Sequence, residues 1–357
     1  MEVSPEITKL INKKFVDGFC SLGEGEVMRE NAKILSAYAS GALVMTPLRF
    51  PDTSPDIVGL YRKQMVDALK DINIATRIAL AVMPNKLTKT ELKTAFEQLK
   101  KHDVEAIVID LRYWKFLQKD VKDDIACNQP LMYIIEAADA TKMTILIHAE
   151  TDNGPFTNIL EMSTWEQKAC ELLDIWLRIY PGLKIGVLHV TTKSMVETIC
   201  RLPEQVFGLI TPQHLYLTFR NFVQHPGRHT AEMIPLPKFD ADRETLQAVV
   251  AHPKLGKKFC YASDSFIHRH DRACQPLCSH VYTIPLAPHM TMEVFAKSFA
   301  LQNAMEDFTV KNMQRKFPNL TRSAGTFGMK KEECYVRQDN LPAIPFLTGT
   351  KLLWSIA

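Results

Sequence analysis

Three apolar, β-branched runs of this chain end in side chains that can bind a metal ion. The residues at these ends are His148, His189 and Asp264. Two neutral imidazoles and one carboxylate, each from a different strand, form a common first shell for zinc. A zinc ion held by this set could support hydrolysis of an amide or ester, with Asp264 as the base. The alternative for each single histidine is a hydrogen-bonded core residue.

A second group of possible ligands lies near Cys274 and Cys278, with His268, His270 and His280 around them. Their spacing matches no common zinc motif. Most of the eight cysteines stand in apolar runs instead, which is typical of buried thiols in a reducing compartment.

The elements that must position these side chains alternate regularly along the chain. Short apolar runs predict eight strands, and each is followed by an amphipathic or helix-like stretch. The expected strands are Phe15–Cys20, Ala42–Met45, Thr76–Val82, Ala106–Leu111, Thr144–His148, Lys184–His189, Phe207–Thr211 and Lys258–Ala262. The expected helices are Met28–Ser40, Ile57–Asp71, Lys89–His102, Ile125–Thr141, Trp165–Tyr180, Ser194–Leu202 and Ala241–His252. Eight strand–helix units predict an α/β fold, a (β/α)8 TIM barrel.

The main alternative is a doubly wound open sheet, which fits less well because no Gly-x-Gly-x-x-Gly follows the first strand. No linker or low-complexity tract interrupts the 357 residues, so we expect one barrel domain over 1–357. Its last part, about 288–357, loses the alternation. We expect helix over Thr291–Lys316 and a wrap over the barrel after it.

Charge and hydropathy exclude several classes of protein. The formal net charge of +3 gives no electrostatic reason to bind nucleic acid or an anionic membrane. The chain contains no run of about 18 apolar residues, so we expect no transmembrane helix. Met1–Lys14 lacks the apolar region of a secretory signal. We therefore expect a cytoplasmic protein, or one of an organelle matrix.

Four local motifs occur in a fixed order: His148-Ala149-Glu150, Leu188-His189-Val190-Thr191-Thr192-Lys193, Thr211-Pro212-Gln213-His214-Leu215 and Asp264-Ser265-x-x-His268. Ile344-Pro345-Phe346-Leu347-Thr348-Gly349, followed by Trp354-Ser355, closes the chain. Together they resemble the dihydroorotases of the shorter, bacterial type, in the amidohydrolase superfamily. The resemblance runs from about Phe15 to the C-terminus.

The resemblance implies a fold, a reaction and a set of site residues. Dihydroorotases open the cyclic amide of dihydroorotate, or close it from carbamoyl aspartate, at two zinc ions bridged by hydroxide and a carboxylated lysine. His148 and His189 match the two histidines that hold one metal. Asp264 matches the ligand of the other metal that also serves as base, and His268 matches a histidine that helps to hold the substrate carboxylate.

Other positions depart from that pattern. The family's first strand reads Asp-x-His-x-His-x-Arg-Asp-Gly, but here Phe19 and Ser21 replace the two histidines. Residues i and i+2 of a strand face the same way, so we expect Phe19 to point into the barrel mouth. Val108 is the expected occupant of the bridging-lysine position, or Asp110 if the register shifts by two.

The clamp for the substrate carboxylate is also changed. Gly23 stands in place of the arginine, and Pro47 falls where an asparagine assists it. An arginine grips a carboxylate through a fork of donors, which glycine cannot supply.

Three hypotheses about function follow. The first is a catalytically inactive pseudoenzyme that serves as a structural or regulatory subunit, with no cofactor or at most one zinc. Its partner would be a second copy, an active paralogue or a larger assembly. The second is a remodelled one-zinc amidohydrolase using His148, His189 and Asp264, or a residual dihydroorotase of pyrimidine biosynthesis.

The third hypothesis is a small-anion sensor that kept part of the mouth. Its binding residues would be His268, Thr191, Lys193 and the loop Thr211–His214. A Thr-Thr-Lys run after a strand is alternatively an ordinary helix cap.

Overall fold

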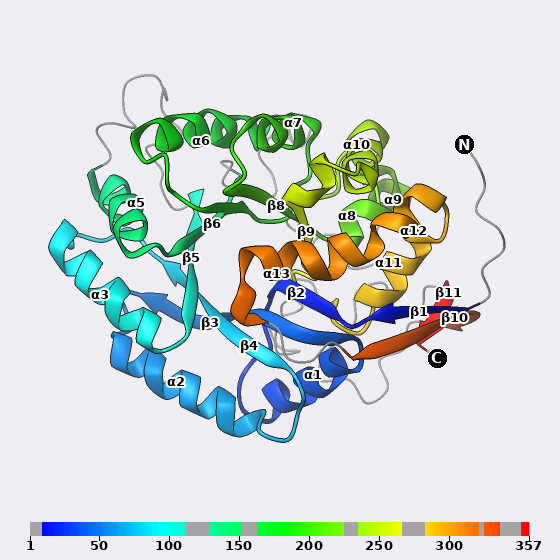
Figure 1. Ribbon diagram of the computed structural model, residues 1–357, viewed down its shortest axis with the longest axis horizontal. Coiled ribbons are helices and arrows are strands. Elements are labelled where there is room, and N and C mark those ends of the chain that lie inside the picture. Colours follow the sequence, from blue (N-terminus) through cyan, green and yellow to red (C-terminus); the bar gives the residue numbers. More distant parts are fainter. Residues whose placement is uncertain are drawn as a thin grey trace.

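The structure, a computed structural model, describes residues 9–111, 129–150, 163–224, 235–265, 283–320, 325–335 and 351–356. Eight parallel strands pair in chain order and form the central sheet (Figure 1). They are β2 (Phe15–Cys20), β3 (Ala39–Phe50), β4 (Ala75–Val82), β5 (Val104–Asp110), β6 (Thr144–His148), β7 (Ile185–Val187), β8 (Val206–Ile210) and β9 (Phe259–Tyr261).

The first and last strands of this sheet meet and close a barrel. Cys20 forms a parallel bridge with Ser265. The Ser21 N–H donates to the Ser265 carbonyl over 2.7 Å, and the Asp264 N–H donates to the Phe19 carbonyl over 2.9 Å. The (β/α)8 barrel is therefore confirmed and the open doubly wound sheet is excluded.

Helices lie around the outside of the barrel and alternate with the strands along the chain (Figure 1). Those between the barrel strands are α1 (Gly25–Tyr38), α2 (Pro55–Ala68), α3 (Lys89–Lys101), α5 (Gln129–Thr141), α6 (Gln167–Ile179), α7 (Lys193–Arg201), α8 (Pro212–Tyr216), α9 (Phe219–Gln224), α10 (Asp240–Ala251) and the 3₁₀ turn η5 (Leu255–Lys258). The predicted ranges of β2 and β6 agree with the structure residue for residue. β7 and β9 are shorter than predicted at both ends: Lys184 lies before β7, Lys258 ends η5, and Leu188 and Ala262 follow the last strand residues.

Apolar side chains separate into two layers, as barrel geometry requires. One layer lies between the strands and the helices around them. The other fills the barrel interior and includes Val16, Phe19, Val108, Leu146 and Phe207. Met313, Phe317 and Leu320 join that interior layer from the segment after the last strand. The barrel is therefore a packed core rather than a pore.

The C-terminal region contains both helices and strands. The predicted helical stretch Thr291–Lys316 is found as α11 (Ala287–Phe295), α12 (Phe299–Glu306), the π-helical turn η6 (Asp307–Lys311) and α13 (Asn312–Lys316), followed by the short 3₁₀ turn η7 (Pro318–Leu320). Beyond it, β10 (Thr326–Tyr335) pairs with β1 (Lys9–Lys13) and with β11 (Lys351–Ile356) in a small antiparallel sheet.

This second sheet was not predicted. Lys330, Lys331, Glu332 and Glu333 give β10 a charged centre with low strand propensity. Its strands come from the two ends of the chain, so their pairing depends on tertiary structure. No helix among the described residues is both long and apolar enough to span a bilayer.

Candidate functional site

Two histidines from neighbouring strands meet at the C-terminal mouth of the barrel. His148 is the last residue of β6, and His189 follows β7 by two residues. The Nδ1 atom of His148 lies 2.6 Å from the Nε2 atom of His189, so one ring nitrogen donates a hydrogen bond to the other. The ring centroids are 4.8 Å apart. His189 has a φ of 34°, a strained value for a side-chain-bearing residue that directs its ring toward β6.

Glu150 is the third member of this group, which the sequence analysis did not single out as a ligand. Its Oε1 atom lies 3.1 Å from the Nδ1 atom of His189, and both side chains are almost fully buried. Among the described residues, potential ligand atoms of His148, Glu150 and His189 lie within 4.8 Å of one another. The signal was present in the sequence, because Glu150 stands two residues after His148 at the end of a strand.

Burial and nearby carboxylates act in opposite directions on His189. Burial lowers its pKa. The charges of Glu150 and Asp264, the hydrogen bond that the ring donates to Glu150 and the charge of the more distant Glu166 outweigh burial and raise the pKa to about 9. At neutral pH the ring therefore carries a proton.

Asp264 lies at the seam where the barrel closes. Its backbone has a φ of 50°, and its N–H donates to the carbonyl of Phe19. Its charge raises the pKa of both His189 and Asp17. Asp264 is not a member of the close group formed by His148, Glu150 and His189. Asp264 therefore acts on His189 through its charge, from outside the 4.8 Å group.

Phe19 lies where the resemblance places a metal-binding histidine. Its ring is fully buried and meets the His148 ring edge to face, with 6.0 Å between centroids and 74° between planes. Val108, at the expected bridging-lysine position, belongs to the same interior layer and is 2% exposed. Packing is also close deeper in the barrel, where a Cβ on Gly18 would stand 2.5 Å from Cδ2 of Leu209. Apolar atoms therefore occupy this side of the mouth.

The other substituted positions offer few ligand atoms. The Ser21 hydroxyl accepts a hydrogen bond from the Gly23 N–H at 3.4 Å. Gly23 has a φ of 77°, which disfavours any side chain at this position, arginine included. Pro47 is exposed in the stretch of β3 where pairing with β4 is interrupted. Asp110 pairs in register with His148 at the end of β5.

A buried glutamate outside the predicted set holds the turn that carries His189. The Oε1 atom of Glu166 accepts from the Thr191 N–H at 2.9 Å and from its hydroxyl at 2.6 Å. The Oε2 atom accepts from the Thr192 N–H at 3.1 Å and from its hydroxyl at 2.5 Å. Glu166 thus satisfies backbone donors at the start of α7. No pattern in the sequence marked this residue.

This contact bears on the hypothesis of an anion sensor. Glu166 already accepts hydrogen bonds from Thr191, and the Lys193 ammonium is largely exposed and lies 3.7 Å from Glu197. Lys238 is buried near Glu166, and burial lowers its pKa. The Lys238 ammonium donates to the Leu236 carbonyl and lies 5.1 Å from the centre of the Trp165 ring.

His214 ends the loop Thr211–His214, which the anion-sensor hypothesis includes, and its ring is neutral. Its Nε2 atom lies 2.9 Å from the Pro235 carbonyl and its Nδ1 atom lies 2.6 Å from the Thr211 hydroxyl. A carbonyl can only accept, so Nε2 is the protonated nitrogen and Nδ1 accepts from Thr211. Burial lowers the pKa of His214 to about 3. His214 therefore stabilises the turn after β8 as a neutral side chain.

Several predicted residues lie outside the described part of the chain. They are His268, the possible zinc group Cys274, Cys278, His270 and His280, and the closing run Ile344–Gly349.

The positions that the resemblance assigns to the first-strand histidines and the bridging lysine do not fit these roles. Phe19 and Val108 offer no ligand atom, and Ser21 is a poor ligand for zinc. One ion fits better, because Nδ1 of His148 and Nε2 of His189 point toward each other and Glu150 supports the far nitrogen of His189. Two imidazole nitrogens on one tetrahedral zinc stand about 3.3 Å apart, so this pair would have to separate to admit it.

No protein-family model matches the chain. Curated relatives include a dihydroorotase of Shewanella piezotolerans, 23% identical over 344 residues that make up 93% of this chain and 94% of the relative. A dihydroorotase of Halorhodospira halophila is 25% identical, with 95% and 96% covered.

The fold is also similar to that of solved dihydroorotase structures. A dihydroorotase of Campylobacter jejuni has a TM-score of 0.75 at 19% identity, covering 98% of this chain and 97% of the other. A Saccharomyces cerevisiae dihydroorotase in complex with 5-fluoroorotic acid has a TM-score of 0.73 at 20% identity, covering 98% and 99%. A D-hydantoinase has a TM-score of 0.64 at 14% sequence identity, covering 96% of this chain and 81% of the other.

Proposed function

We propose that this chain, dihydroorotase-like in sequence and in its amidohydrolase barrel, is a pseudoenzyme that acts as a structural or regulatory subunit. The observation that carries the proposal is the buried Phe19 ring packed against His148 inside the barrel mouth. An aromatic ring in this place fills the volume that a metal ion and its histidine ligands would need. Val108 adds a second apolar side chain where a bridging amine would be required.

The substituted side chains would each stabilise the transition state of this reaction, so their loss should raise the activation barrier by several kcal/mol in total. One donor that stabilises a developing charge is worth about 3–4 kcal/mol of barrier. At the positions that the resemblance matches, this chain lacks two histidine ligands of one metal, the bridging lysine and the arginine of the carboxylate clamp. We expect the rate of dihydroorotate ring opening or closure to fall far below the usual enzyme range of about 1–10³ s⁻¹.

The test is a turnover assay on purified protein with added zinc, run with dihydroorotate and with carbamoyl aspartate. A His189→Ala variant purified in parallel controls for contaminating host enzyme. Equal, near-background rates in both preparations support the proposal. A rate in the usual enzyme range that depends on His189 overturns it.

A restored variant provides a second measurement. Phe19→His, Ser21→His and Val108→Lys together return the missing ligand types and leave Gly23 alone, because its φ disfavours arginine. We expect zinc per chain to rise in this variant relative to the wild type, by elemental analysis of the folded protein. An unchanged zinc content would mean that these three side chains are not what limits binding.

A second candidate function is a one-zinc hydrolase, which is favoured by the close group of His148, Glu150 and His189. Elemental analysis separates the two. One zinc per chain in the wild type, together with hydrolysis of some amide that is lost in His189→Ala, supports the hydrolase. Metal-free protein supports the pseudoenzyme.

A further inference from the structure

Two lysines lie at the N-terminal end of the barrel, away from the histidine pair. Lys184 directly precedes β7, and Lys316 ends α13, whose next residue, Phe317, belongs to the interior layer of the barrel. Barrel enzymes use the C-terminal end for chemistry, whereas the N-terminal end usually serves stability. A binding site at these lysines would therefore be separate from the candidate site described above.

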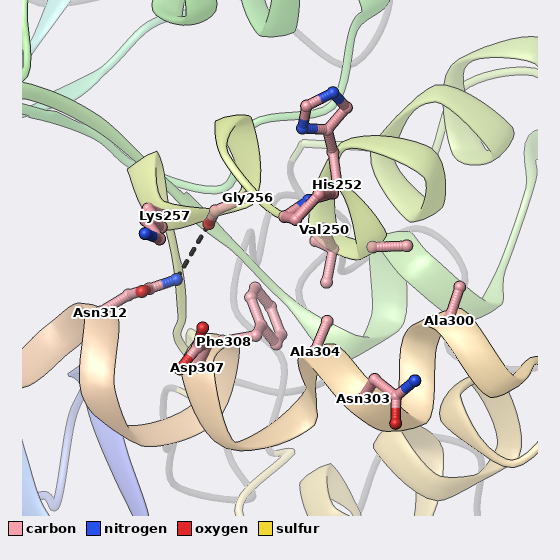
Figure 2. A pocket seen from close by; sticks show the side chains of 12 residues that line it. Val250, His252, Gly256, Lys257, Ala300, Asn303, Ala304, Asp307, Phe308 and Asn312 are labelled. Carbon is pink, nitrogen blue, oxygen red and sulfur yellow. Dashed lines mark hydrogen bonds between the residues drawn. The ribbon is translucent and has the colours of Figure 1, made fainter.

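The helix that carries Lys316 is fixed to the barrel at its first residue. The side-chain amide of Asn312 donates to the carbonyls of Gly256 and Phe259 over 2.9 and 2.7 Å. Figure 2 shows the first of these contacts, in which Asn312 reaches from its helix to the turn η5. Because Phe259 begins β9, these bonds tie α13 to the N-terminal end of a barrel strand. The backbone that presents Lys316 is therefore held in place.

The two lysines share one pair of aromatic rings. The rings of Phe207 and Phe317 meet edge to face, with 6.1 Å between their centroids. The Lys316 ammonium lies 5.4 Å from the centre of the Phe207 ring, and the Lys184 ammonium lies 5.8 Å from the centre of the Phe317 ring. The Lys184 ammonium also donates to the Lys316 carbonyl over 2.9 Å. Two positive charges are thus gathered beside one aromatic pair.

Neither of these lysines has an ionic partner in the described part of the chain. No described carboxylate lies within 4.0 Å of either ammonium. An ammonium has three donors, and each of these two uses one on a backbone carbonyl, Lys184 on that of Lys316 and Lys316 on that of Glu204. Both side chains are partly buried, and burial lowers the pKa of each lysine. Like charges that are partly buried without a counterion are unfavourable.

Two carboxylates act on this lysine pair only at longer range. The charge of Glu105 raises the pKa of one lysine and that of Glu204 raises the pKa of the other, but neither outweighs burial. Glu105 accepts a hydrogen bond from Asn319 over 2.9 Å and lies 3.4 Å from Arg77, and Glu204 is exposed. Two donors on each ammonium therefore remain for a ligand of negative charge.

We propose that Lys184 and Lys316 together bind a phosphate group at the N-terminal end of the barrel. A phosphate monoester carries about −1.5 to −2 charges at pH 7 and three strong acceptor oxygens. One such group balances both ammonium charges and accepts from their remaining donors. Inorganic phosphate and the phosphate end of a small metabolite share this chemistry. Because the site is remote from the barrel mouth, it stands or falls independently of the loss of catalysis.

The test is calorimetric titration of the purified full chain with sodium phosphate, at an ionic strength held constant with sodium chloride. The wild type is expected to bind one phosphate per chain and to melt at a higher temperature when phosphate is bound. Lys184→Met and Lys316→Met keep apolar side chains against the rings and remove the charges. Each is expected to weaken binding about tenfold to a hundredfold, because a charged hydrogen bond is lost. Lys184→Arg keeps the charge and should keep binding.

The matched control is Lys311→Met on the neighbouring turn η6. The Lys311 ammonium already lies 3.3 Å from Glu306 and 3.2 Å from Asp307, so its loss should leave phosphate affinity at the wild-type value. A parallel titration with glycerol phosphate distinguishes the sources, because tighter binding than inorganic phosphate indicates a metabolite and weaker binding indicates the free ion.

Two results would overturn the phosphate site. One is a wild type that binds neither probe saturably at constant ionic strength. The other is equal phosphate affinity in the wild type, Lys184→Met and Lys316→Met. If the lysines had a structural role alone, both methionine variants would melt at a lower temperature while their phosphate affinity stayed the same.

Discussion

The Nδ1 atom of His148 and the Nε2 atom of His189 lie 2.6 Å apart and share a hydrogen bond. These two atoms face the place where a metal ion would stand, yet they are closer than the about 3.3 Å that one tetrahedral zinc imposes on two imidazole nitrogens. Glu150 extends this pair into a chain Glu150–His189–His148, in which protons can link the three side chains. We therefore predict that the mouth of the barrel is stable without an ion.

We predict that the wild type binds at most one zinc per chain, even with zinc in excess, because the described mouth has ligands for no more than one ion. Elemental analysis after gel filtration gives the stoichiometry. Chelation should change the melting temperature little, since protons already link the side chains. Two zinc ions per chain would contradict this account.

Replacing Phe19 by alanine should destabilise the fold by about 3–5 kcal/mol, because it leaves a large cavity in the barrel interior. Urea denaturation gives the free energy of unfolding. Phe239→Ala is the control: Phe239 is 46% exposed, and its loss should cost less than about 1 kcal/mol. Similar values for the two variants would place Phe19 outside the packed core.

Glu166→Gln should lower the free energy of unfolding by about 2–3 kcal/mol. The amide nitrogen of glutamine is a donor, so either Thr191 or Thr192 would lose the acceptor for its buried N–H. Glu197→Gln changes the same side chain on α7, where it is 65% exposed and 3.7 Å from Lys193, and should cost less than about 0.5 kcal/mol. Equal effects in urea denaturation would argue against the proposed clamp on the His189 turn.

Asp17 should make the stability depend on pH between about 4 and 6. Burial raises its pKa from 3.8 to about 6, although the N–H groups of Ser263 and Phe19 donate to its Oδ1 atom. A carboxyl whose pKa is raised by folding stabilises the fold below its unfolded pKa. That contribution, about 3 kcal/mol, is lost as pH rises through 6.

The measurement is the difference in unfolding free energy between the wild type and Asp17→Asn at several pH values. An asparagine oxygen can still accept from both N–H groups, and other titrations cancel in the difference. We expect the wild type to lose stability relative to the variant as pH rises from 4 to 7. A flat difference would show that the Asp17 carboxyl ionises as easily in the folded chain as in water.

Much of the barrel could be predicted from the sequence because its signals are local. Each apolar run is short, and each amphipathic stretch after it has helical spacing, as at Lys89–Lys101 with its Thr88–Glu91 capping box. Alternation of such units, repeated eight times, leaves few arrangements other than a closed parallel barrel. The residue types at strand ends also indicated that His148 and His189 would share one end of the barrel.

The sequence by itself determined the alternation of strands and helices, the two histidines at the mouth and the apolar residue at position 19. Only the tertiary structure decided that Glu150 joins His189, that Glu166 reaches Thr191 and Thr192 across 25 and 26 positions, and that β1 and β10 pair from opposite ends of the chain. The physical reason is range: strand and helix propensities act over a few neighbouring residues. The partner of a buried carboxylate or of an edge strand depends on how the whole chain packs.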